Sequence, residues 1–270
     1  MNWLVSLNGN SIILDNLDRM NSPHFSVFQD SEDHLAEQFF LRSNHFKGVE
    51  DPQQIYSSTI GLIQLINGAS AIHWGFNDYI RRGHVKFDEL YFSTEEYPSD
   101  ADWTSARVSG EILPSNPFIG KASTSKWLNP YNSATTGYIE LCIEHEDIFI
   151  LLRQISVGFD WRNLYCIWDT VCHYSGGVKK IIKDLGLDEK QVKAFTGTVN
   201  NFGVLGLEAR HGVMGWKIPK NTVSHTEAIA IVNNVVVKYL KNKVCLGCKF
   251  KEWETQFNKS IQSTANATAD

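Results

Sequence analysis

The first part of the chain alternates short runs of β-forming residues with turn residues. The runs span residues 3–7, 11–14 and 25–28. Between them lie Asn8-Gly9-Asn10 and Asn21-Ser22-Pro23, which are typical of turns. We therefore expect the three runs to form an antiparallel meander, and residues 35–41 are apolar enough to continue the sheet.

A long amphipathic helix is predicted next. Asp51 can cap its first turn, and Pro52 suits the first helical position because proline has no N–H to leave unpaired there. Apolar positions then recur every three or four residues up to Gly75, and they include Ile55, Leu62, Ile63, Ile66, Ala69 and Ile72. We expect one helix over residues 52–74 that packs this face on the N-terminal sheet.

Two further strands are expected after this helix, at residues 84–92 and 106–113. Residues 114–136 then contain many Ser, Thr, Asn, Pro and Gly residues and few aliphatic ones. Such a composition is typical of a long surface connection and suggests a domain boundary.

Helical signals dominate the rest of the chain. Residues 138–157 have helical periodicity, and a helix over residues 160–174 should end at Ser175-Gly176-Gly177. A short helix over 177–185, a helix capped by Asp188 and a glycine-rich loop over 203–215 follow. Ser224 and Glu227 then form a capping-box pattern before a helix over residues 228–240.

These patterns predict an α+β fold, because the strands and helices are segregated along the chain. We expect a small N-terminal antiparallel sheet with one long helix in residues 1–125. A C-terminal helical bundle should occupy residues 137–245, and residues 246–270 should form a frayed tail.

Composition and charge restrict the classes of function. The 270 residues are 43% hydrophobic and 20% charged, with a formal net charge of −5, which predicts a folded protein without a global attraction to nucleic acid or anionic membranes. No basic leader and no apolar run of about 18 to 20 residues occurs. The five cysteines are dispersed, so we expect a cytoplasmic protein with reduced thiols.

Polar residues gather at one predicted helix-to-loop junction and make it the main candidate site. Catalytic roles are assigned to Glu208, Arg210 and His211, and binding roles to Asn200, Asn201, Arg162 and Asn163. Arg210 would hold a phosphate while His211 transfers a proton during RNA phosphodiester cleavage. The structural alternative is that Arg210 and Glu208 pair with each other or tie the loop to neighbouring helices, while His211 binds a main-chain carbonyl.

A family resemblance supports the catalytic alternative. The segments Asp160-Trp161-Arg162-Asn163-Leu164-Tyr165, Thr198-Val199-Asn200 and Glu208-Ala209-Arg210-His211-Gly212 resemble the C-terminal helical domain of uncharacterised bacterial proteins, which is similar to HEPN domains. HEPN ribonucleases usually carry an arginine, an adjacent polar residue and a histidine a few residues further on, whereas Arg210 and His211 are adjacent here. The resemblance implies a role in phage defence or as a toxin, metal-independent cleavage of RNA, and a homodimer.

Other motifs are weaker. Cys245-Leu246-Gly247-Cys248 is a single CxxC motif without a second ligand pair, so we expect free thiols, no bound metal and no cofactor. His34, His45, His73 and His84 have no metal-ligand spacing and receive no role. The chain contains no Walker A loop, GxGxxG fingerprint, GxSxG elbow or HExxH motif.

Three hypotheses of function follow from the sequence. The first is a bacterial defence or toxin-type protein with a HEPN-like bundle that acts on RNA or serves as a binding and dimerisation module. The second is a non-enzymatic sensor or adaptor whose N-terminal sheet recognises a protein or ligand. The third is a small-molecule enzyme with a pocket between the two halves.

Overall fold

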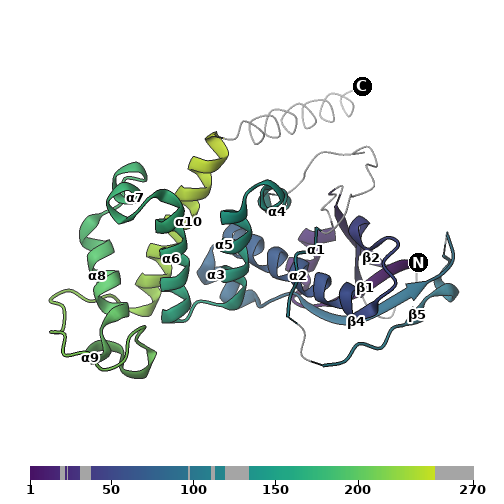
Figure 1. The fold of residues 1–270 in the computed structure, drawn as a ribbon, viewed down its shortest axis with the longest axis horizontal. Helices are drawn as coiled ribbons and strands as arrows, with labels where there is room; N and C mark the ends of the chain where they lie inside the picture. The colour runs from purple at the N-terminus through teal and green to yellow at the C-terminus, as the bar shows by residue number, and fades with distance from the viewer. Residues whose placement is uncertain are drawn as a thin grey trace.

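A computed structural model describes residues 1–18, 22, 24–30, 38–96, 98–110, 113–118 and 134–246. The fold is α+β, as predicted, with a five-stranded antiparallel sheet near the N-terminus and helices over most of the C-terminal half. Figure 1 shows the sheet at one end of the molecule and the helices α7, α8 and α9 at the other end.

The sheet has a different strand order from the predicted meander. Its strands, in spatial order, are β2 (Phe25–Asp30), β3 (Gln38–Ser43), β1 (Asn2–Asn8), β4 (Lys86–Ser93) and β5 (Thr104–Ser105). The first strand therefore lies in the middle, where Val5 pairs with Leu41 on one side and with Leu90 on the other. The predicted strands at 3–7, 25–28 and 84–92 are confirmed within one or two residues, and the described part of 35–41 belongs to β3.

Residues 11–14 were expected to form a strand, and this prediction is wrong. They begin the helix α1 (Ser11–Asp18). The side chain of Asn10 accepts a hydrogen bond from the main-chain N–H of Ile12. The main-chain carbonyl of Asn10 accepts hydrogen bonds from the N–H groups of Ile13 and Leu14. Asn10 therefore caps a helix rather than closing a hairpin, and Ile13, Leu14 and Leu17 are buried on one face of that helix.

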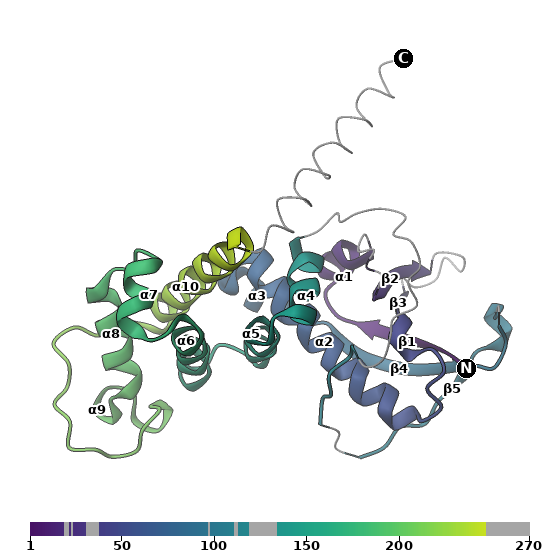
Figure 2. The same cartoon turned by 45° about the horizontal axis from the view of Figure 1, so that its top comes forward.

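The predicted long helix is confirmed as α2 (Pro52–Trp74), with Asp51 as its N-cap and Gly75 as its C-cap. Because α2 is covered on several sides, almost all of its last two thirds is buried. It packs against the sheet and also against the later helices α4 (Ala134–Glu144) and α5 (Glu146–Val157), so it lies between the two halves of the chain (Figures 1 and 2). A second helix, α3 (Phe76–Arg82), follows it directly.

The prediction of a strand at residues 106–113 is also wrong for the described residues of that segment. Regular pairing stops at Ser105, apart from one further hydrogen bond from Ala106 N to Leu90 O. The chain then runs along α2, whose Gln53 and Ser57 side chains donate hydrogen bonds to Ser109 O and Leu113 O. Because α2 side chains bind these carbonyls, the segment can leave the sheet.

The C-terminal helices follow the predicted caps closely. After α5 come α6 (Trp161–Ser175), α7 (Val178–Asp184), α8 (Glu189–Asn200), the short α9 (Phe202–Leu205) and α10 (His225–Leu246). The capping box of Ser224 and Glu227 is formed, and Gly176 ends α6 in a left-handed conformation. One difference occurs in residues 138–157, where His145 adopts an extended conformation and divides the predicted helix into α4 and α5.

The short 3-10 helices lie in connecting segments: η1 (Asn44–Phe46), η2 (Asp100–Asp102) and η3 (Gly206–Glu208). Buried side chains from the sheet, α2 and the C-terminal helices join in one continuous hydrophobic cluster. The predicted domain boundary at residue 125 and nearly all of the predicted tail lie outside the described residues. None of the described helices has the length and apolar character that crossing a bilayer requires.

Candidate functional site

The predicted site residues come from three places that the bundle brings close together. Arg162 and Asn163 open α6, where the Asp160 side chain accepts hydrogen bonds from both of their main-chain N–H groups. Asn200 and Asn201 end α8, and Glu208, Arg210 and His211 follow η3. The segment after α8 folds back on α8, since the N–H of Arg210 donates to Val199 O at 2.9 Å.

Arg162 holds the loop in place. Its guanidinium donates hydrogen bonds to Ala209 O at 3.3 Å and to Leu207 O at 2.8 Å. Asn163 binds elsewhere, because its amide donates to Gln154 O and Gly158 O and so connects α6 to the end of α5. Both side chains thus bind main-chain carbonyls, but only Arg162 positions the junction.

Of the two asparagines at the end of α8, Asn201 also fixes the loop. Asn201 is buried, and its side-chain amide donates a hydrogen bond to Lys217 O at 3.0 Å. The neighbouring Thr198 hydroxyl accepts one from Val223 N. The side-chain oxygens of Asn200 and Asn201 are buried and receive no hydrogen bond from any described residue. The 203–215 loop is therefore anchored at its return to α10.

Arg210 and Glu208 do not pair with each other, which was one form of the structural alternative, but Arg210 does connect the loop to a neighbouring helix, which was the other form. The guanidinium of Arg210 lies over the ring of Tyr165 on α6, 4.0 Å from its centroid, and the side chain is exposed. Within the described residues, neither Arg210 nor Glu208 contacts a side chain of opposite charge. A guanidinium that contacts a ring through its face keeps its N–H groups, which lie in its plane, available for an anion.

His211 has a different neighbour. Its half-buried ring meets Trp216 edge to face, with 5.5 Å between the ring centroids. It forms no hydrogen bond with a main-chain carbonyl of the described chain, so the second part of the structural alternative is absent there too. The structure thus places Arg210 against α6 and His211 against the loop, without a direct contact between the two side chains.

A cleft of about 490 Å³ lies beside the junction. Its lining residues are Asp160, Trp161, Arg162, Leu207, Glu208 and His225. The ring of His225 is 5.1 Å from that of Trp161, and its Nε2 is 2.7 Å from Phe159 O. Sequence reasoning found Arg162 and Glu208 but missed Trp161 and His225, although His225 lies inside the capping-box segment.

The loop between α9 and α10 exposes large apolar side chains beside these polar groups. Leu207 and Val213 are 83% and 82% exposed, and the loop also exposes Met214, Trp216 and Ile218. Several exposed apolar residues in one segment are typical of a surface that binds another molecule.

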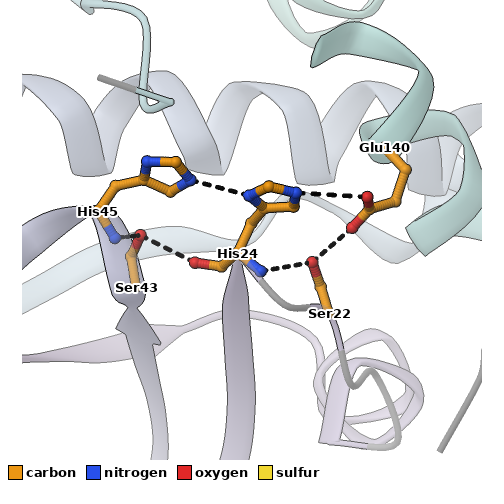
Figure 3. A network of polar contacts seen from close by, with 5 residues as sticks. All are labelled: Ser22, His24, Ser43, His45 and Glu140. Atoms are coloured by element: carbon orange, nitrogen blue, oxygen red, sulfur yellow. Dashed lines mark hydrogen bonds and ion pairs between the residues drawn. The ribbon is translucent and has the colours of Figure 1, made fainter. Parts of the chain in front are cut away.

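A second polar cluster, which the sequence analysis did not find, joins the sheet to α4 (Figure 3). His24 Nδ1 lies 2.9 Å from His45 Nε2, and His24 Nε2 lies 3.5 Å from a carboxylate oxygen of Glu140. The Ser22 hydroxyl donates to the other oxygen of Glu140 at 2.6 Å. Phe118 meets both imidazoles with its ring at a steep angle, which shields them from solvent.

Burial, and then the charge that His45 can carry, lower the pKa of His24 to about 4. Both imidazoles can then hydrogen-bond as neutral rings, with His24 donating to Glu140 and accepting from His45. This order of donors resembles the relays that orient a catalytic base. In this chain it connects two parts of the fold that are far apart in sequence.

No protein-family model, curated protein or solved structure matches the chain.

The described residues hold no group of three or more His, Cys, Asp or Glu side chains that could bind a metal ion. Cys142, Cys166 and Cys172 are free thiols. Cys248 and the side chain of Cys245 lie outside the described part of the chain, so the prediction for the CxxC motif stays a prediction.

Proposed function

We propose that the junction of α6, α8 and the 206–216 loop binds single-stranded RNA and cleaves it without a metal ion. The observation that carries the proposal is that Arg210 has no carboxylate partner among the described residues. Its guanidinium is exposed and oriented by Tyr165, and no carboxylate of the described chain neutralises it. A phosphate group is the ligand that such a guanidinium recognises best, because its N–H groups match two phosphate oxygens.

His211 supplies the proton transfer in this proposal. The 2′-oxygen of the ribose attacks the adjacent phosphorus while the bond from phosphorus to the 5′-oxygen breaks. His211 accepts the proton of the 2′-hydroxyl and returns a proton to the departing 5′-oxygen, so a 2′,3′-cyclic phosphate and a 5′-hydroxyl result. Arg210 stabilises the negative charge that develops on the phosphoryl oxygens.

Trp216 would add a stacking surface for a base next to the scissile phosphate. Its indole is half exposed and meets His211 edge to face. Unpaired bases stack on such rings, and stacking of this kind contributes about 1 to 3 kcal/mol per base. Single-stranded RNA is therefore a better candidate than a duplex, whose bases are not accessible in this way.

The exposed apolar residues of the loop fit the homodimer that the HEPN resemblance implies. Val213 and Met214 are too exposed to stabilise the monomer, and a second copy of the loop would cover them. We place this dimer in the cytoplasm as a defence or toxin-type ribonuclease, with the non-enzymatic binding module as the alternative.

The test is cleavage of a fluorescently labelled single-stranded RNA in the presence of a metal chelator. Wild-type protein should cleave the RNA, and it should bind but not cleave a DNA of the same sequence, which lacks the attacking 2′-hydroxyl. His211→Ala should lose cleavage and keep binding, whereas Arg210→Gln should lose both. Lys220→Gln changes an exposed lysine of the same loop and should behave as wild type.

Two outcomes would contradict the proposal. The first is a wild-type protein that cleaves no RNA, in which case binding alone would favour the binding module. The second is full cleavage by His211→Ala. The melting temperature of each variant must be measured as well, because a large decrease in His211→Ala would indicate a structural role.

A further inference from the structure

The face of the sheet that points away from α1 and α2 carries a pocket of about 270 Å³. The strand pairing explains which side chains reach it, since directly paired residues share a face. Phe28 pairs with Phe40, and Leu4 pairs with Tyr91. Trp103 closes the pocket from the segment before β5.

Aromatic side chains form most of the lining. The ring centroids of Phe28 and Phe40 are 5.9 Å apart, and those of Phe40 and Tyr91 are 6.5 Å apart. These rings, with Leu4, offer flat apolar surface to a planar ligand.

Arg42 is the only cation among the described residues that line the pocket. Its guanidinium lies between two rings, 4.8 Å from the centroid of Phe28 and 5.6 Å from that of Trp103. No side chain in the described part of the chain forms an ion pair with it. The side chain is exposed overall, and the rings around its guanidinium partly desolvate it, which lowers its pKa, although an arginine remains charged at neutral pH. An anion that enters the pocket would give this guanidinium the partner that it lacks.

Carboxylates around the pocket limit the size of that anion. Asp100 lines the pocket, and Asp88, Glu89 and Asp102 lie on the adjoining β4 and η2. These carboxylates would repel a polyphosphate or a nucleic acid strand. A ligand with one anionic group can place that group on Arg42 and keep the rest of the molecule uncharged near the carboxylates. Asp100 can accept a hydrogen bond from an amino group at the other end of such a ligand.

We propose that this pocket binds a small aromatic molecule with one anionic group, which contacts Arg42, and an amino group, which contacts Asp100. The ring stacks against the aromatic residues of the sheet and Trp103. The anionic group is a carboxylate or a monophosphate, because both offer two oxygens to the guanidinium. The pocket lies on the sheet, at the opposite end of the molecule from α9 (Figure 1), so this site is independent of the proposed RNA site.

Two pairs of probes test the proposal and distinguish the two anions. 4-Aminobenzoate carries a carboxylate and an amino group at opposite ends of one ring, and 4-aminobenzamide is its neutral counterpart. Adenosine monophosphate and adenosine form the corresponding phosphate pair. Isothermal titration calorimetry on the full chain should show that at least one anionic probe binds tenfold or more tightly than its neutral counterpart.

Variants then show whether Arg42 causes the difference. Arg42→Gln should lower the affinity for the anionic probe by tenfold or more and leave the affinity for its neutral counterpart unchanged, so that the two probes bind equally. Arg42→Lys keeps the charge but loses the two-pronged geometry, and it should fall between wild type and Arg42→Gln. Arg107→Gln removes an exposed arginine outside the pocket lining and should bind as wild type.

The comparison of probes on the wild-type protein decides the proposal even if Arg42→Gln fails to fold. Equal affinity within both probe pairs, or no binding of either anionic probe at about millimolar concentration, overturns it. An undiminished preference for the anion in folded Arg42→Gln also overturns it.

Discussion

The side chain of Asn67, buried inside α2, pairs with both main-chain polar groups of Val85. Its Oδ1 accepts a hydrogen bond from Val85 N at 2.9 Å, and its Nδ2 donates one to Val85 O at 2.8 Å. The hydroxyl of Tyr79 donates a second hydrogen bond to the same Oδ1 at 2.6 Å. An amide side chain thus takes the place of a neighbouring strand just before β4 and connects this strand to α2.

Replacing Asn67 by Leu should therefore destabilise the fold more than an ordinary core substitution of similar size. The N–H and C=O groups of Val85 would lose their partner, at about 1 to 3 kcal/mol for each group left unpaired, while the Tyr79 hydroxyl would keep its contact with His84. Tyr79→Phe removes one of these hydrogen bonds and should cost about 1 kcal/mol. Urea unfolding would measure both changes, and equal stability of Asn67→Leu and wild type would contradict this account.

Gly68→Ala should also destabilise the protein strongly. A Cβ atom at this position would lie 2.1 Å from Leu152 O, which is main chain of α5 and cannot rotate away. The helices would have to separate, so a loss of about 1 to 3 kcal/mol is expected although alanine favours helix. Gln54→Ala, at an exposed position of α2, is the control and should be neutral in the same thermal unfolding assay.

Leu62→Asp tests the apolar face of α2 that the sequence predicted. Leu62 is 1% exposed, so the substitution would bury a carboxylate without a partner and should cost several kcal/mol, about 3 or more. A melting temperature close to that of wild type would show that this part of α2 is not packed as described.

Acidification should weaken the fold through His24. Its pKa is about 4 in the folded protein and near 6.5 when unfolded, so the unfolded chain binds the proton more readily. The contribution of the neutral imidazole is complete above pH 6.5 and is lost as the pH falls towards 4, at up to about 1.4 kcal/mol per pH unit. Burial is the larger cause of the lowered pKa, and the charge that His45 can carry acts in the same direction.

Urea unfolding at several pH values between about 7 and 5 would measure this loss. His24→Gln should reduce the pH dependence, and His173→Gln, at an exposed position of α6, should retain it. An identical dependence in wild type and His24→Gln would show that other groups cause it.

Local signals predicted elements well where a cap and a periodic pattern agreed. Asp51-Pro52 and Gly75 marked both ends of α2, and Ser224 with Glu227 marked the beginning of α10. The same kind of signal was misinterpreted at Asn10, because an asparagine beside a glycine suits a turn as well as a helix cap. The choice between them depends on Leu17, which completes a buried helical face.

The candidate sites were harder to predict than the helices, because their residues come from segments that are far apart in the sequence. The sequence analysis named Arg162 as a binding residue but gave no contact for it, whereas in the fold it donates hydrogen bonds to Leu207 O and Ala209 O. The cluster of His24, His45 and Glu140 could not be anticipated, because Glu140 reaches it only after α4 packs beside the sheet. No spacing in the sequence encodes that approach.

The central position of α2 has a consequence for the newly made chain. The helix is complete at Trp74, but α5, which covers Gly68, begins only at Glu146. At synthesis rates of about 5 to 20 residues per second, that apolar side of α2 waits on the order of several seconds for its cover. During translation this side of α2 is therefore where nascent chains would first aggregate. A ribosome-bound chaperone would protect the chain by binding there.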